Sequence, residues 1–317
     1  MTMMLNTRAL WAVESMLAHA EERRVEAHPI EKGGRCIDCG VIARGSLLAG
    51  LDLARICLAD LAQVSLLSGE VGGIACPIVQ VFTDHPVVAC LASQYAGWAI
   101  TDDHYFAMGS GPMRVAYGGE AIYAKLGLAR QVADTVVGVL ESNNLPTPGV
   151  LAKIASACGV SPSAVTLLVA PTASLAGGIQ VVARSVETAL HKLVELDFDV
   201  SRVVSGHGTA PLPPIAKNDV AAIGRTNDAI LYGARVILHV TGDDATIEAI
   251  GPKVPSSSSH DYGEPFSTIF ARYGHDFYKV DPHLFSPAQV VFQNINTGRT
   301  HCYGKLAPDV LARSFYS

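Results

Sequence analysis

Arg184 and Glu187 are the residues whose types and spacing most directly suggest chemistry in this chain. They lie in a segment whose apolar residues recur every three or four positions, which predicts one helix over residues 179–193. Residues three apart on a helix project from the same side, so the arginine and the carboxylate would face one another. The sequence therefore indicates this segment as the first candidate site.

Gly177 and Gly178 directly precede the helical pattern. Glycine lacks a Cβ atom, so we expect a ligand to approach the backbone N–H groups closely at this helix start. A simpler interpretation stays open, because an Arg/Glu pair at this spacing is usually a solvated surface ion pair. The glycine pair and the low content of charged residues, 16% of the chain, favour the functional interpretation.

The composition excludes several classes of protein. The chain has 317 residues, 49% of them hydrophobic, and a formal net charge of −6 with no basic run, which argues against nucleic-acid binding. Its longer apolar stretches are interrupted by Ser, Thr, Pro and Gly, and its first residues lack the apolar core of a signal peptide. We therefore expect a cytoplasmic enzyme without a membrane span.

The common catalytic and metal-binding motifs are missing. The sequence contains no nucleophile elbow, no phosphate-binding glycine loop, and no HxH or HExxH pair. Cys36 and Cys39 have C-x-x-C spacing, but a structural zinc site would need a second such pair. We expect buried free thiols and no metal.

Strands alternate with helices along the chain, which predicts a layered α/β architecture with mixed sheets. A turn-rich segment at residues 143–148 suggests a junction between an N-terminal domain, 1–146, and a C-terminal domain, 147–317. Whether the C-terminal segment packs back on the first domain stays open. Residues 203–214 are expected to be a strand running into a Gly/Pro loop, and residues 253–260 a mobile linker.

Eight short segments are more specific than any of these general patterns: Asn6–Leu10, Gly69–Ile74, Thr83–Pro86, Leu91–Trp98, Tyr105–Pro112, Leu140–Ser142, Ala183–Glu187 and His275–Pro287. Taken together and in this order, they closely resemble the methenyltetrahydromethanopterin cyclohydrolase family. The resemblance extends from Leu5 to Phe315.

The resemblance implies an enzyme of one-carbon metabolism, in methanogenesis or in formaldehyde oxidation. Members of the family open the methenyl bridge of methenyltetrahydromethanopterin reversibly with water, giving the 5-formyl derivative. The resemblance further implies a homotrimer without metal or organic cofactor, which holds the pterin in a cleft between two domains. The catalytic arginine and glutamate of the family fall on Arg184 and Glu187.

The methenyl carbon belongs to a cationic amidinium group, so it needs a positioned water and a base rather than a Lewis acid. We expect Glu187 to orient the water and accept its proton, and Arg184 to keep Glu187 ionised and stabilise the developing oxygen charge.

Pterin recognition needs an acceptor for two N–H groups. Glu141, at the end of a predicted buried strand, is our candidate, although a carboxylate there could instead cap a turn. Glu70 and Asp84 are weaker candidates. The further residues expected to line the site are Phe106, Ser110 and Arg114.

Two other functions are compatible with the sequence. A cyclohydrolase acting on methenyltetrahydrofolate would share the reaction, and a non-catalytic pterin-binding protein would bind without turnover. A general α/β hydrolase is disfavoured because the sequence lacks nucleophile and metal motifs.

Overall fold

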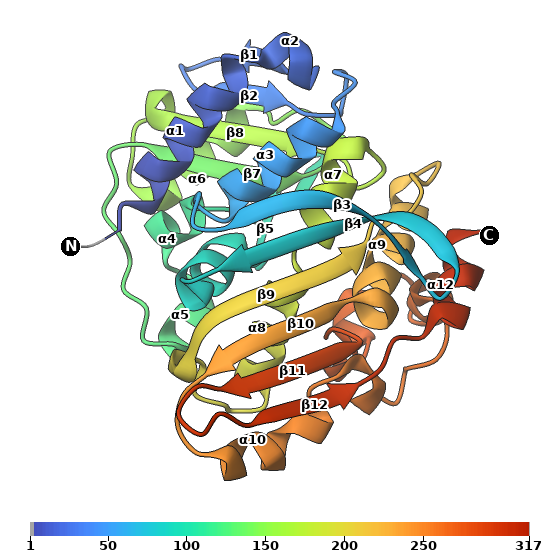
Figure 1. The fold of residues 1–317 in the computed structure, drawn as a ribbon. Helices are drawn as coiled ribbons and strands as arrows, with labels where there is room; N and C mark the ends of the chain where they lie inside the picture. The colour runs from blue at the N-terminus through green and yellow to red at the C-terminus, as the bar shows by residue number, and fades with distance from the viewer. Residues whose placement is uncertain (1–2, 317) are drawn as a thin grey trace. The chain divides into compact units, whose positions relative to one another are not determined.

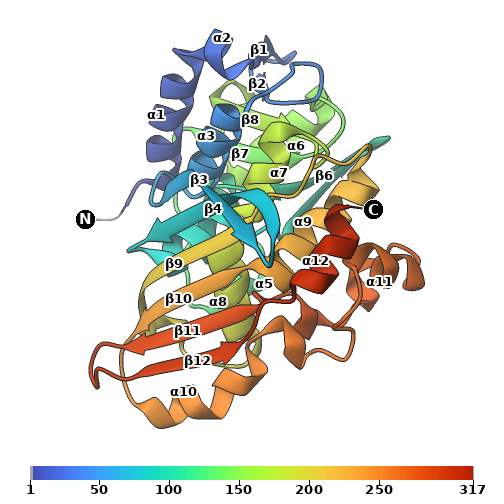
Figure 2. The ribbon, with the colours of Figure 1, turned by 45° about the vertical axis from the view of Figure 1, so that its right-hand side comes forward.

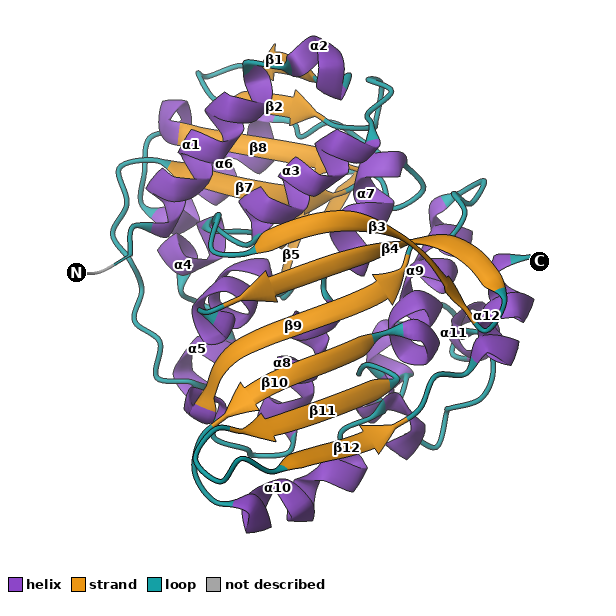
Figure 3. Ribbon diagram, in the orientation of Figure 1, coloured by secondary structure: helices purple, strands orange, loops and turns teal. Residues whose placement is uncertain are grey.

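The computed structural model describes residues 3–316, apart from the side chain of Tyr278. The chain forms two compact units: unit 1 contains residues 1–62 and 88–180, and unit 2 contains residues 63–87 and 181–317. Each unit is built on one six-stranded mixed sheet with helices packed against it, as Figures 1 and 3 show. The expected mixed α/β architecture is confirmed.

The sheet of unit 1 has parallel strands at its centre. Its strands, in spatial order, are β1 (Glu26–Pro29), β2 (Arg35–Asp38), β8 (Val165–Ala170), β7 (Val136–Glu141), β6 (Tyr105–Ser110) and β5 (Trp98–Asp102). The strands β2, β8 and β7 are parallel, and the remaining neighbours are antiparallel. Every residue of β8 is buried, as expected for a strand covered on both faces.

Helices cover both faces of this sheet. Residues of α1 (Leu5–Leu17) and α3 (Leu47–Cys57) share one apolar cluster with Val137, Val139 and Leu168. Residues of α4 (Met113–Tyr117) and α6 (Pro148–Cys158) share the other with Val136, Leu140 and Leu167. Neighbouring strand residues therefore point to opposite layers. The remaining helical segments are α2 (Ala20–Arg23), the π-helix Val87–Gln94, α5 (Ala121–Lys125), the 3₁₀ turn Pro162–Ala164 and α7 (Leu175–Val182).

The division into units differs from the single boundary expected after residue 146. The turn-rich segment 143–148 lies inside unit 1, where it leads into α6, whose N-cap Thr147 accepts a hydrogen bond from the Val150 N–H at 3.2 Å. The hairpin of β3 (Gln63–Val71) and β4 (Ile74–Thr83) belongs to unit 2, because β4 pairs with β9 (Val203–Pro211). The C-terminal segment lies in unit 2 as well.

The sheet of unit 2 is mainly antiparallel. Its strands, in spatial order, are β12 (Thr300–Gly304), β11 (Gln289–Asn294), β10 (Arg235–Val240), β9, β4 and β3, with only β10 and β11 parallel. The nine residues of β9 include Gly206 and Gly208. Both glycines pair in register with β4 and β10, so the strand expected within residues 203–214 continues through them and ends at Pro211, before the loop with Pro213 and Pro214.

Two helices, α8 (Ser185–Glu195) and α9 (Asp219–Gly233), pack against this sheet. The helices α11 (Phe266–Arg272) and α12 (Pro308–Phe315) pack in turn on α9, as Figure 2 shows. The remaining helical segments are α10 (Asp244–Ile250) and the 3₁₀ turns Val200–Arg202, Gly251–Lys253, Ser256–Ser258, Phe277–Lys279 and Pro282–Leu284.

Residues 253–260 are ordered by hydrogen bonds, so the expectation of a mobile linker is wrong. Ser256 is completely buried and its hydroxyl donates to the Leu231 carbonyl. Lys192 of α8 donates to the Ser258 hydroxyl at 3.3 Å and to the His283 carbonyl at 2.6 Å. No helix in residues 3–316 combines the length and the apolar character that crossing a bilayer requires.

Candidate active site

The predicted helix over residues 179–193 is interrupted directly before Ser185. The helix α7 ends at Val182, and α8 begins at Ser185 with Arg184 at its N-cap. The Arg184 N–H donates to the Val181 carbonyl at 3.1 Å, and the Arg184 carbonyl accepts from the Thr188 N–H at 2.9 Å. The backbone of Arg184 is therefore fixed from both sides at the turn between the helices.

Arg184 and Glu187 are both buried at the start of α8. Their exposed fractions are 7% and 4%, which excludes the interpretation as a solvated surface pair. Glu187 lies in the first turn, where the backbone N–H groups of the helix stabilise a negative charge. Burial of an arginine and a carboxylate at one helix start is costly, so a functional reason for both is expected.

Two glycines of β9 allow α8 to lie directly on the sheet. A Cβ atom on Gly208 would come within 2.3 Å of the Ser185 hydroxyl oxygen, and one on Gly206 within 2.7 Å of a Val186 methyl group. Both distances are far below van der Waals contact. The position of Arg184 and Glu187 therefore depends on a Gly-x-Gly pattern inside a strand, a signal that is present in the sequence but that we did not connect with this helix.

In unit 1, polar groups gather where the parallel strands end. Glu141 is the last residue of β7, as expected, and its carboxylate accepts a hydrogen bond from Thr172, which follows β8. The carboxyl ends of parallel strands are where α/β proteins usually bind ligands. Thr172 had no distinctive sequence signal and was not among the predicted residues.

Phe106 lies on the same face of the sheet as Glu141. Glu141 pairs with Met108 of β6, and Phe106 is two residues from Met108 along that strand. The Ser142 hydroxyl donates to the Phe106 carbonyl at 2.9 Å, which ties the two strand ends together. Phe106 is 56% exposed, so its ring is available for stacking beside the half-buried carboxylate of Glu141.

The glycine pair does not precede its helix, which corrects one expectation. The helix α7 begins at Leu175, so Gly177 and Gly178 lie inside its first turn. The Gly177 N–H donates to the Ser174 hydroxyl and the Gly178 N–H to the Ser174 carbonyl, each at 3.0 Å. A Cβ on Gly177 would lie 2.0 Å from the Pro171 carbonyl oxygen, so this glycine is needed for packing rather than for a ligand.

Arg114 is fully buried and engaged within unit 1, which corrects its assignment to the substrate site. Its guanidinium makes a bidentate ion pair with Glu120, with N–O distances of 2.7 and 2.9 Å, and Nη1 donates to the Leu91 carbonyl at 3.0 Å. The group also lies over the rings of Tyr95 and Tyr123. These contacts use the guanidinium to hold the end of the π-helix, so it cannot line an open site.

Ser110 is also removed from the candidate lining by its burial. It is 2% exposed, and its hydroxyl donates to the Val139 carbonyl at 3.3 Å. The weaker pterin candidates both lie in unit 2: Glu70 is exposed on β3, and Asp84 accepts a hydrogen bond from the Ser205 hydroxyl at 2.7 Å.

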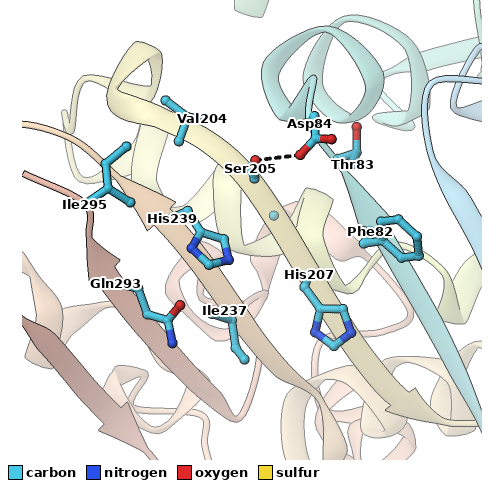
Figure 4. Close-up of a pocket in the computed structure, with 11 residues that line it drawn as sticks. Phe82, Thr83, Asp84, Val204, Ser205, His207, Ile237, His239, Gln293 and Ile295 are labelled. Atoms are coloured by element: carbon cyan, nitrogen blue, oxygen red, sulfur yellow. Dashed lines mark hydrogen bonds between the residues drawn. The ribbon is translucent and has the colours of Figure 1, made fainter. Parts of the chain in front are cut away.

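A pocket of about 720 Å³ lies on unit 2, and Figure 4 shows the residues that line it. Burial, with a smaller contribution from neighbouring His239, lowers the pKa of His207 in this pocket. Its walls are formed by Phe82, Thr83, Asp84, Val204, Ser205, Gly206, His207, Ile237, His239, Gln293 and Ile295. Neither Arg184 nor Glu187 belongs to it.

The cysteines of the C-x-x-C pattern are buried free thiols, as predicted. Burial, with a smaller contribution from Asp38, raises the pKa of Cys36 to about 12, and burial also raises the pKa of Cys39. A raised pKa disfavours the thiolate, so these thiols are poor nucleophiles near neutral pH. Within residues 3–316, no group of three or more His, Cys, Asp or Glu side chains is arranged to hold a metal ion.

Comparison with known proteins covers almost the whole chain. A family model described as Cyclohydrolase (MCH) matches residues 4–315. The methenyltetrahydromethanopterin cyclohydrolase of Rhodopirellula baltica is 53% identical over 287 residues, which are 89% of this chain and 86% of that protein. The proteins of the same name from Methylobacterium sp. and Methanococcoides burtonii are 45% and 41% identical, over 98% of this chain and 97% and 98% of their own lengths.

The match leaves no large segment of the chain without a counterpart, and it includes the start of α8 with Arg184 and Glu187. Identities above 40% over nearly full length are far beyond what a shared fold alone would produce. The chain therefore belongs to the methenyltetrahydromethanopterin cyclohydrolase family.

Proposed function

We propose that this protein is a hydrolase acting on a cyclic amidine, which reversibly opens the methenyl bridge of 5,10-methenyltetrahydromethanopterin to give 5-formyltetrahydromethanopterin. The observation that carries the proposal is the burial of Arg184 and Glu187 at the start of α8, in a chain matched by the family over residues 4–315. A buried base beside a buried cation suits the addition of water to a cationic carbon.

The reaction begins when Glu187 orients a water molecule and accepts one of its protons as the oxygen bonds to the methenyl carbon. The amidinium loses its positive charge and becomes a tetrahedral carbinolamine. The bond from this carbon to N10 then breaks, N10 takes up a proton, and the hydroxyl proton is released to leave the formyl group on N5. The net change is one water consumed and one proton released.

Arg184 acts as an electrostatic group and not as an acid, because a guanidinium does not lose its proton near neutral pH. It keeps Glu187 ionised before the attack and stabilises negative charge on the attacking oxygen. Loss of a general base costs about 10²- to 10⁴-fold in rate, and loss of one stabilising donor about 10²- to 10³-fold.

Pterin binding is assigned to Glu141 and Phe106. The carboxylate of Glu141 would accept hydrogen bonds from the 2-amino group and N3–H of the pterin, and the exposed ring of Phe106 would stack on the heterocycle. Replacing Glu141 with Ala should therefore raise KM much more than it lowers kcat, and an unchanged KM would remove this assignment.

The proposal includes three properties that follow from family membership. The enzyme acts in the cytoplasm, works without a metal or organic cofactor, and assembles as a homotrimer. Each can be tested separately, because activity in the presence of a chelator tests the metal, and the mass in solution tests the assembly.

The experiment that tests the proposal follows the absorbance of methenyltetrahydromethanopterin in the presence of purified, chelator-treated protein. The variants are Arg184→Ala and Glu187→Gln, and the matched control is Glu195→Gln, which alters an exposed carboxylate on the same helix. We expect rapid decay with the wild type and the control, and losses of about 10²-fold or more with both site variants.

Other results would point elsewhere. Turnover of Glu187→Gln within a few-fold of the wild type would refute the general-base role. Binding of the pterin without decay would indicate a carrier protein. A higher kcat/KM with methenyltetrahydrofolate than with the methanopterin substrate would indicate a folate enzyme.

A further inference from the structure

The loop that follows β2, residues 39–45, is fixed at the end of the unit 1 sheet by one buried carboxylate. Asp38 is the last residue of β2 and has no exposed surface. Its two oxygens accept four hydrogen bonds from the backbone N–H groups of residues 40–43, at 2.7–2.9 Å. These bonds satisfy the carboxylate and hold the backbone in one conformation. We call residues 39–45 the Asp38 loop.

The Asp38 loop lies at the same edge of the sheet as Glu141. The strands β2, β8 and β7 run parallel, so their carboxyl ends meet at one edge (Figure 3). A Cβ atom on Gly40 would lie 2.8 Å from Ser174 Oγ, so the loop packs directly on the segment after β8. Thr172 of that segment donates to Glu141. Two strand spacings, about 10 Å, therefore separate the Asp38 loop from the carboxylate assigned to the pterin.

Two arginines meet beside the Asp38 loop. The Gly45 N–H donates to the Arg24 carbonyl at 2.9 Å, so the Cα atoms of Arg24 and Arg44 are at most about 8 Å apart. Both side chains are exposed. Arg24 is the C-cap of α2 and has a left-handed conformation, with φ 54° and ψ 44°. Glycine is the usual residue at such a position, so a long cationic side chain is present where the backbone favours none.

The guanidinium groups of Arg24 and Arg44 take part in no ion pair or hydrogen bond within residues 3–316. The preceding arginine differs in this respect, because Arg23 Nε donates to Asp52 at 2.9 Å. The N–H groups of residues 40–43 are all used by the Asp38 carboxylate, so they are not available to a second anion. An anion bound at this edge would therefore be held by the two arginines.

Ile42 adds an apolar side chain to the same loop. It is 74% exposed, although its N–H is held by Asp38 Oδ2 at 2.7 Å. Its neighbours face the protein, because Val41 packs against the unit 1 core and Ala43 is buried. A fixed aliphatic side chain beside two unpaired guanidinium groups suits a ligand that is apolar in one part and anionic in the next.

We propose that the Asp38 loop is an anion-binding subsite that holds the distal part of the substrate. Ile42 packs against the aryl ring on N10, and Arg24 and Arg44 bind an anionic group beyond that ring. The inference rests on the proposed function, because it takes Glu141 as the partner of the pterin. Phe106 belongs to β6, on the other side of β7, so the direction toward β8 and β2 is left for the rest of the molecule. The anionic group is a carboxylate or a phosphate, since both match the planar donors of arginine.

The first test measures the opening of two substrates by Arg24→Gln, Arg44→Gln and the double variant. One substrate is methenyltetrahydromethanopterin, and the other is a truncated analogue whose N10 carries an unsubstituted phenyl ring. The control is Lys32→Gln, which removes the same charge from the exposed turn between β1 and β2, at the opposite end of these strands. We expect each arginine variant to raise KM for the full substrate about tenfold, the effect of one charge-assisted hydrogen bond, with little change in kcat. With the truncated analogue, KM should be the same for the wild type and all variants.

The results separate this inference from the proposed function. A wild type that opens neither substrate would overturn both. A wild type that opens the full substrate, with a KM that the double variant leaves within twofold, would overturn the inference alone. An equal rise of KM for both substrates would also refute the subsite, because the arginines would then act on the pterin end of the site.

Two further analogues identify the anion. Each carries the phenyl ring of the truncated analogue with one added group, a carboxylate in the first and a phosphate in the second. The group that belongs in the subsite should lower KM about tenfold relative to the truncated analogue in the wild type and not in the double variant. If neither group lowered KM, the assignment of an anion to the two arginines would be wrong.

A salt titration of the wild type avoids substitutions and covers the case in which the variants fail to fold. Raising the NaCl concentration from about 0.01 to 1 M shortens the Debye length from about 30 to 3 Å, which screens exposed charges. The KM for the full substrate should rise severalfold over this range, while the KM for the truncated analogue stays constant. Equal salt dependence of the two substrates would refute a distal contact with the exposed arginines.

Discussion

Replacing Gly208 with Ala should inactivate the enzyme without touching a catalytic residue. The added methyl group would lie 2.3 Å from Ser185 Oγ and 3.0 Å from a methyl group of Val186. Carbon and oxygen atoms in contact are normally about 3.5 Å apart, so the first turn of α8 must move by roughly 1 Å. A displacement of that size at a catalytic group costs about 10²-fold in rate, and overpacking costs about 1–3 kcal/mol of stability.

The assay is the steady-state opening of methenyltetrahydromethanopterin, with urea unfolding measured in parallel. The second substitution, to be combined with Gly208→Ala, is Ser185→Ala. It removes the Oγ atom and leaves the Ser185 Cβ at 3.2 Å from the added methyl group. The Ser185 hydroxyl is buried and has no hydrogen-bond partner among the residues that the structure describes, so its removal alone should cost little. The double variant should regain most of the lost kcat.

The control is Thr209→Ala, which alters the neighbouring residue on the other face of β9. If kcat of Gly208→Ala stayed within about threefold of the wild type at unchanged stability, the contact between β9 and α8 would not position Arg184 and Glu187. A full loss of kcat that Ser185→Ala does not relieve would mean that the methyl group acts through another contact.

Two further predictions concern buried charges. Burial raises the pKa of Asp228 from 3.8 to about 7, although its Oδ1 accepts from the Phe266 N–H at 2.7 Å. The folded state therefore binds this proton more tightly than the unfolded state, and the resulting stability is present below about pH 4 and lost as the pH rises through 7. At about 1.4 kcal/mol per unit, the free energy of unfolding should fall by about 4 kcal/mol relative to that of Asp228→Asn over this range, and urea titrations with parallel pH profiles would contradict the assignment. Arg114→Met should lower the stability by about 3–5 kcal/mol, because it leaves Glu120 buried without its partner. Its KM should stay close to that of the wild type in the folded fraction, and a large rise in KM at unchanged stability would return Arg114 to the substrate site.

The sequence predicted best what depends on neighbouring residues. The buried strand ending at Glu141 and the layered mixed α/β fold follow from local apolar patterns and are confirmed. The break before Ser185 was missed because no Pro or Gly separates Val182 from Val186, and the apolar pattern continues across it. Two domains were expected, but the bounds of the two units differ from the expected ones for another reason: residues 63–87 join unit 2 by pairing with β9, and such long-range pairing leaves no local signal.

Some residues of the candidate site were predicted correctly and others were not, because long-range contacts leave no local signal in the sequence. Arg184 and Arg114 have similar local surroundings in the sequence, since each follows small residues and a glycine-containing segment. Only the fold shows that Arg114 pairs with Glu120 and the carbonyls of the π-helix. Residue type and spacing thus indicate which groups could do chemistry, whereas the contacts made by distant segments decide which of them are already engaged.

The charges of the proposed reaction explain why a buried arginine and a buried glutamate would be required together. The substrate carries one positive charge, so an ionised Arg184–Glu187 pair with no net charge does not repel it. When water adds, the substrate becomes neutral and Glu187 becomes neutral, while Arg184 stays positive. The total charge of the site therefore remains +1 throughout the step, which avoids moving charge through a region of low dielectric constant.

This balance predicts different kinetic signatures for the two site variants. Glu187→Gln would leave two positive charges facing each other when the substrate binds, so KM should rise while kcat falls. Arg184→Ala would leave the carboxylate alone with the cation, which favours the bound substrate over the neutral intermediate, so kcat should fall while KM stays equal or decreases. If KM rose in Arg184→Ala and stayed unchanged in Glu187→Gln, the charge balance would be wrong even if both residues proved essential.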